Sequence, residues 1–169
     1  MTSLPTLVVF LVVCQALGAL IGAGAAVWSE LSYVKAMRRD GKIDTAERAH
    51  LLVIGHGLYG GMILLLLASL GLVVVAYLEH APSQPALSSS YWILVALVLL
   101  VITVSASLAR RRAPFKLASA ILFAAWWFLV YLSLGWLPLS FGSAVMSFLI
   151  VAAVFYAVLH FARILMLPQ

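Results

Sequence analysis

The residues best suited to chemistry in this sequence are its histidines, His50, His56, His80 and His160. Two neutral imidazoles that face each other across a helical bundle can hold a haem iron. His56 and His160 lie at similar depths in two apolar segments, and Tyr156 shares the helical face of His160. This pattern predicts a b-type haem site with His56 and His160 as ligands and Tyr156 beside them. The alternative is two interfacial histidines that bond to backbone, to lipid phosphate or to each other.

Glu30 is a second candidate, because its helix is followed by a turn and a helix that carries two of the histidines. If the chain reverses near Lys42, Glu30 comes close to His50 or His56. A carboxylate beside a histidine raises the pKa of the imidazole and orients the ring. We therefore expect an interfacial polar cluster of Glu30, His50 and His56. An ion pair that holds the two helices together is favoured over a proton or metal site.

Sets of residues typical of enzymes are missing from the sequence. It has one cysteine, Cys14, and it lacks a phosphate-binding loop, the Cys/His spacing of a metal site and a recognisable nucleophile with its base. We expect no catalytic residues and no protein-bound metal site, which favours a non-enzymatic protein.

The composition places this chain in a membrane. Of the 169 residues, 66% are hydrophobic and 9% are charged, against about 45–50% and about 25% in soluble domains. Five apolar segments are long enough, or nearly so, to span the hydrocarbon core, which takes about 20 helical residues. They cover residues 7–27, 54–78, 91–108, 117–136 and 141–161. We therefore predict an all-α, five-helix transmembrane bundle that forms one integral membrane domain over residues 1–169.

The basic residues predict how this bundle is oriented. All ten lie in the connection between the first two segments, in the connection between the third and fourth, or at the end of the fifth. By the positive-inside rule, the N-terminus is outside and the C-terminus is cytoplasmic. The net charge of +5 thus reflects topology and does not indicate nucleic acid. Arg110, Arg111 and Arg112 are expected to contact anionic lipid as well.

The first connection is expected to project from the membrane as a helical hairpin. Apolar residues keep helical spacing beyond Val27, and Asp40-Gly41 forms a stop signal. A second helix from Thr45 to Leu78 would be about 51 Å long, which exceeds the hydrocarbon thickness of about 30 Å. The sequence therefore predicts a cytoplasmic hairpin of about two turns.

Small and polar residues within the spans predict how the first two helices pack. Gly18 and Gly22 are four residues apart, as are Gly57 and Gly61, and this spacing lets helix backbones approach closely. We expect these glycines to join the first two helices, with self-association as the alternative. Near the midplane, Gln15 and Ser69 are expected to form an interhelical hydrogen bond, and the region lacks the buried carboxylate typical of ion-coupled transport.

The turn Arg39-Asp40-Gly41-Lys42-Ile43-Asp44-Thr45-Ala46-Glu47, with the glycine-rich helices around it, resembles a family of small, uncharacterised prokaryotic multi-pass membrane proteins. The layout is also distantly similar to copper-resistance D-type membrane proteins. This resemblance covers about a third of the chain and implies a prokaryotic inner-membrane protein. Such families often carry a histidine early in the first helix, where this sequence has Gln15.

Three functions are compatible with these features. The first is an accessory or structural subunit of a membrane complex, which associates with other subunits or with itself. A b-type haem electron-transfer protein that uses His56 and His160 is the second. A small transporter of neutral solutes is the third, because a bare midplane does not exclude a neutral path.

Overall fold

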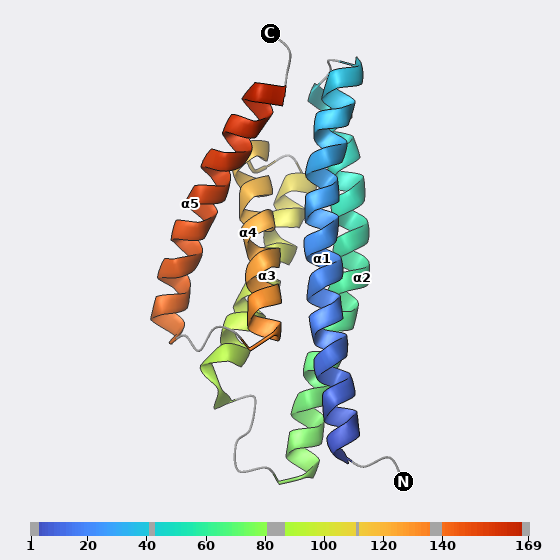
Figure 1. Ribbon diagram of the computed structural model, residues 1–169, viewed down its shortest axis with the longest axis vertical. Coiled ribbons are helices and arrows are strands. Elements are labelled where there is room, and N and C mark those ends of the chain that lie inside the picture. Colours follow the sequence, from blue (N-terminus) through green and yellow to red (C-terminus); the bar gives the residue numbers. More distant parts are fainter. Residues whose placement is uncertain (1–3, 41–42, 81–86, 111, 136–139, 167–169) are drawn as a thin grey trace.

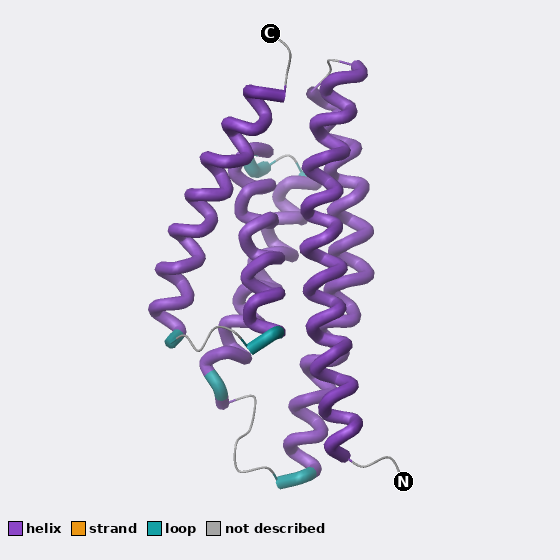
Figure 2. Tube along the Cα trace, viewed as in Figure 1, coloured by secondary structure: helices purple, strands orange, loops and turns teal. Residues whose placement is uncertain are grey.

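The computed structural model of this chain describes residues 4–40, 43–80, 87–110, 112–135 and 140–166. Within these ranges, the side chains of residues 4, 36–40, 43–54, 56, 58 and 166 are outside the description. The described chain is helical apart from short turns and caps (Figure 2). Its helices are α1 (Leu4–Asp40), α2 (Ile43–Leu78), α3 (Ser89–Ala109), α4 (Phe115–Ser133) and α5 (Phe141–Met166).

All five helices contain a segment that is long and apolar enough to cross a membrane. The prediction of an all-α protein with five membrane-spanning helices is therefore confirmed at this level. The chain is an integral membrane protein by the length and composition of its helices.

The helices begin and end close to the predicted positions, except that α5 is longer and α4 is shorter than predicted. Helix α5 ends at Met166, five residues beyond the predicted end at residue 161. The fourth span was expected to reach residue 136, whereas α4 ends at Ser133. The N–H of Leu134 still donates to the carbonyl of Val130, but Gly135 has a φ of +70°, which glycine adopts without strain. This left-handed residue ends the helix. At the first connection, α1 ends at Asp40 and α2 begins at Ile43, two residues before the predicted start.

The bundle is built from a long antiparallel pair and a group of three shorter helices (Figure 1). Helices α1 and α2 pack along each other, while α4 contacts α1, α3 and α5 and so lies at the centre. Its side chains Leu122, Trp126 and Leu129 are almost fully buried. Of the α4 span, 56% is buried inside the chain, against 11% of the α5 span. Helix α5 is therefore the least covered helix.

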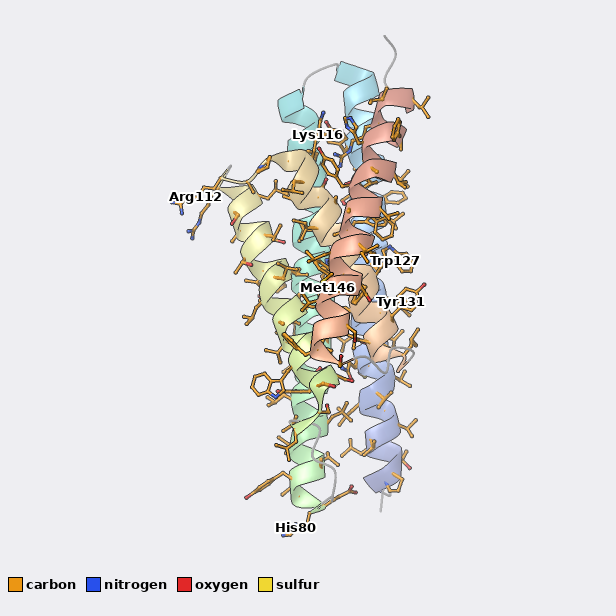
Figure 3. The ribbon with its side chains drawn as sticks, turned by 90° about the vertical axis from the view of Figure 1, so that its left-hand side faces the viewer. His80, Arg112, Lys116, Trp127, Tyr131 and Met146 are labelled. Atoms are coloured by element: carbon orange, nitrogen blue, oxygen red, sulfur yellow. The ribbon has the colours of Figure 1, made fainter. Side chains whose placement is uncertain are left out.

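The charged residues distinguish the two ends of the bundle. We call one end of the bundle the basic end, where α1, α3 and α5 stop. The described basic residues at this end are Lys35, Arg110, Arg112, Lys116 and Arg163. At the other end, called the N-terminal end, α1, α3 and α5 begin. Figure 3 shows Arg112 extending away from the helices near the basic end and His80 at the N-terminal end. Helices α1 and α2 extend beyond the other three at the N-terminal end (Figure 1).

Candidate functional site

Three helices meet at a buried charge cluster near the basic end. Glu30 of α1 and Arg163 of α5 are 8% and 5% exposed. The Nη2 atom of Arg163 donates to both carboxylate oxygens of Glu30, at 2.9 and 2.7 Å. It also donates to the hydroxyl of Ser119 in α4, at 2.7 Å. The cluster thus ties α1, α4 and α5 together at one point.

Each member reaches this point for a local reason. Glu30 continues a buried helical face of α1 that includes Ala23, Ala26 and Tyr33, at spacings of three and four residues. Arg163 lies in the last turn of α5, where a cation is favoured by the partial negative charge of the helix end. Ser119 donates its own proton to the carbonyl of Lys116, at 3.2 Å, so its oxygen is free to accept from the arginine.

Aromatic rings cover the arginine. Tyr33 and Phe115 stack with ring centroids 4.8 Å apart and an interplanar angle of 21°. The Cζ atom of Arg163 lies 4.9 Å from the centroid of Tyr33 and 5.2 Å from that of Phe115. These distances allow cation–π attraction, which is strongest where the cation is desolvated. The Nε atom of Arg163 is buried and has no hydrogen-bond partner within the described residues.

The arrangement of this cluster suits a structural role better than a catalytic one. The carboxylate of Glu30 is held by a guanidinium, so it is a poor general base, and Arg163 does not release its proton in proteins. A buried pair of this kind contributes little net stability compared with apolar residues, but it fixes which helix faces meet. The cluster therefore adds a polar contact to the apolar packing of α5 on α4.

This cluster was not predicted from the sequence. Arg163 was expected only to mark the topology, and Glu30 was expected near His50 and His56, whose side chains lie outside the described residues. The interfacial cluster of Glu30 with those histidines therefore stays a prediction. The one feature of the sequence that could have pointed to Arg163 is its position at the end of an apolar span. Arg163 and Glu30 are 133 positions apart, so no local spacing relates the two residues.

The proposed haem ligands are placed only in part. His160 is half-buried, and its ring lies parallel to that of Tyr156 at a centroid distance of 6.1 Å. The side chain of His56 is outside the described residues. Helix α5 packs mainly on α4, whereas α2 packs mainly on α1. Among the described residues, no group of three or more His, Cys, Asp or Glu side chains could hold a metal ion.

The structure brings the two glycine pairs to the interface between α1 and α2. A Cβ atom on Gly18 would lie 2.7 Å from the backbone nitrogen of Leu65, and one on Gly61 would lie 2.6 Å from the carbonyl of Gly18. A Cβ atom on Gly57 would lie 2.1 Å from that of Ala25. Gly22 lies beside α4 as well, because a Cβ atom there would overlap the ring of Trp126.

Gln15 and Ser69 share a cavity. The cavity has a volume of about 150 Å³, and both residues line it together with residues at the start of α3 and Leu132 of α4. Ser69 donates to the carbonyl of Leu65 in its own helix, at 2.7 Å. The hydroxyl of Ser69 thus bonds within its own helix, and the expected hydrogen bond between Gln15 and Ser69 stays a prediction.

Comparisons of this chain with protein-family models, with curated proteins and with solved structures found no match. The resemblance of the first connection to small prokaryotic membrane proteins therefore stays a prediction.

Proposed function

We propose that this integral membrane protein is a non-enzymatic accessory subunit of a membrane complex, and that α5 is the helix that meets its partner. The observation that carries the proposal is the low burial of α5. Only 11% of its span is buried inside the chain, although its basic end is anchored by the pair of Arg163 and Glu30.

The uncovered side of α5 forms a continuous stripe. Its members recur at spacings of three and four residues, so they share one face of the helix. They are Met146, Ile150, Ala153, Ala157, Phe161 and Ile164, and all are exposed. The two alanines are four residues apart, which is the spacing that allows close contact between membrane helices. This α5 stripe supports the docking of another transmembrane helix.

The charge cluster gives a physical reason for this arrangement. One face of α5 packs on α4 through Phe148 and Phe155, which contact Phe128 and Phe123. Arg163 adds hydrogen bonds to Glu30 and Ser119 at the basic end, so α5 is held through this face and its apolar stripe stays uncovered. Such an anchor suits a helix whose exposed face serves another protein.

Photo-crosslinking in native membranes tests this proposal. A photoreactive residue at position 153 is expected to give one discrete adduct, and the same residue at Leu20, which is 45% exposed on α1, is expected to give none. An adduct of twice the monomer mass would identify the partner as a second copy. Equal, weak labelling at both positions would contradict the proposal.

We further propose that the basic end faces the cytoplasm of a prokaryotic cell, with the N-terminus outside and the membrane the inner one. Support comes from the gathering of the described basic residues at that end. Tyr33 stacks on Phe115, the first residue of α4, and α1 continues for seven residues to Asp40, or about 10 Å. This extension supports a cytoplasmic hairpin. The exposed Arg110 and Arg112 are positioned to contact anionic lipid, and Arg111 lies outside the described residues.

A further inference from the structure

The cavity beside Gln15 lies at a depth where the surrounding surface is apolar. Gln15 is eight residues from Leu7, where the apolar run of α1 begins, which corresponds to about 12 Å along the helix. On the outer side of α1, Val12 and Val13 are 41% and 50% exposed. At the same depth, the inner side of the helix therefore faces a polar cavity while the outer side faces lipid.

Hydrogen-bonding groups from three helices line this cavity. Gln15 comes from α1 and Ser69 from α2, while Ser88, Ser90 and Tyr91 surround the start of α3. The hydroxyl of Ser88 accepts from the N–H of Tyr91, at 3.2 Å, and caps that helix. These groups carry no formal charge, so together they offer neutral donors and acceptors.

The position of α3 explains how polar groups reach this depth. The first turn of α3 lies level with Gln15 and Ser69, since residues of all three helices line one cavity. Helix α1 extends eleven residues beyond Gln15, to Leu4, and α2 extends nine beyond Ser69, to Leu78. The cavity is lined by residues of α1 and α2, by the start of α3 and by Leu132 of α4, and Figure 1 shows α1 and α2 extending beyond α3 and α4 at the N-terminal end.

The polar side chain of Gln15 lines this cavity. An unpaired amide in hydrocarbon is costly, and lipid chains cannot satisfy it. The cavity of about 150 Å³ has room for about five water molecules at about 30 Å³ each. A molecule of glycerol, which has three hydroxyl groups, is small enough to fit in this cavity.

We infer that this cavity is a water-accessible site for a small uncharged molecule with several hydrogen-bonding groups, such as a short polyol or an amide. Gln15 supplies a donor and an acceptor to the bound molecule, and the hydroxyl groups of Ser69 and Tyr91 complete the site. This inference is independent of the partner proposed for α5.

Accessibility of a cysteine at position 15 tests whether water reaches the cavity. In a Cys14→Ser background reconstituted into lipid nanodiscs, Gln15→Cys is expected to react about tenfold faster with a charged methanethiosulfonate than Val13→Cys, because only a hydrated thiol ionises. Val13 is the matched control, since it lies two residues away and faces lipid. Equal rates would overturn the inference.

Ligand-observed nuclear magnetic resonance then tests binding. Glycerol, erythritol and urea are the probes, and saturation transfer from the protein to at least one is expected. The transfer should fall about fivefold in Gln15→Leu and stay unchanged in Cys14→Ser. Thermal unfolding of each variant shows whether it is folded. No transfer to any probe, or an equal signal from folded Gln15→Leu, would overturn the proposed site.

Discussion

The indole ring of Trp126 fills the space that a side chain at position 22 would occupy. A Cβ atom on Gly22 would overlap the ring of Trp126, which is 1% exposed. The contact joins α1 to α4, and hence the long helical pair to the three shorter helices. Gly22, which was predicted to serve the contact of α1 with α2, therefore also makes room for Trp126, the largest of the fully buried side chains.

Replacement of Gly22 by alanine should weaken the packing of α1 against α4. The added methyl group meets the rigid ring of Trp126, and overpacking of this kind costs about 1–3 kcal/mol. We expect Gly22→Ala to lower the thermal unfolding temperature in detergent. Gly24→Ala is the matched control, because a Cβ atom there has no neighbour within 4 Å. Equal unfolding temperatures for the two variants would contradict this contact.

The contact between α1 and α2 gives a second test with an adjacent control. A Cβ atom on Gly61 would lie 2.6 Å from the carbonyl oxygen of Gly18, and backbone cannot move aside as a flexible side chain can. Gly61→Ala should lower the free energy of unfolding by about 1–3 kcal/mol. Gly60→Ala meets no atom within 4 Å and should be neutral or slightly stabilising. Denaturation in mixed detergent micelles would measure both, and a larger loss for Gly60→Ala would refute the packing.

The ion pair of Glu30 and Arg163 predicts a non-additive effect. Glu30→Gln leaves a buried guanidinium without its counter-charge, which costs about 3–5 kcal/mol in buried pairs. The double variant Glu30→Met, Arg163→Met removes both charges and should be more stable than Glu30→Met or Arg163→Met alone. Unfolding of the unsubstituted protein and of these three variants measures the coupling. Glu79→Gln, at an exposed carboxylate, serves as the control, and additive losses would argue against the pair.

An absorption spectrum distinguishes the proposed subunit from a haem protein. Protein purified in mild detergent is expected to show no Soret band before or after reduction with dithionite, because α2 and α5 each pack mainly on other helices. Folded protein is verified by its far-ultraviolet circular dichroism. A Soret band that is lost on replacement of either His56 or His160 would support the haem interpretation instead.

Labelling of single cysteines tests the predicted orientation of the protein in the membrane. In a Cys14→Ser background, Leu87→Cys at the N-terminal end and Arg112→Cys at the basic end place single thiols at exposed positions. A membrane-impermeant maleimide added to intact cells should label Leu87→Cys and spare Arg112→Cys until the cells are opened. The reverse pattern would place the basic end outside.

The number of helices and their approximate bounds follow from the sequence because they depend on local properties. An apolar run of about 20 residues must be satisfied within its own helix in lipid, whatever its neighbours are. The glycine spacing predicted close helix contacts for the same reason, since it depends on one helix face. The end of α4 was misplaced by three residues because a left-handed glycine, rather than loss of apolar character, ends that helix.

The partners of individual side chains were decided by the tertiary structure. Five helices of similar hydropathy can be ordered and rotated in many ways, and apolar periodicity distinguishes them poorly. The order and rotation found here bring Arg163 to Glu30 across 133 positions, and Trp126 to Gly22. They also place the start of α3 level with Gln15 and Ser69, so that residues of three helices line one cavity. These pairings depend on how the helices are arranged around α4, and the spacing of residues along one helix carries no information about that arrangement.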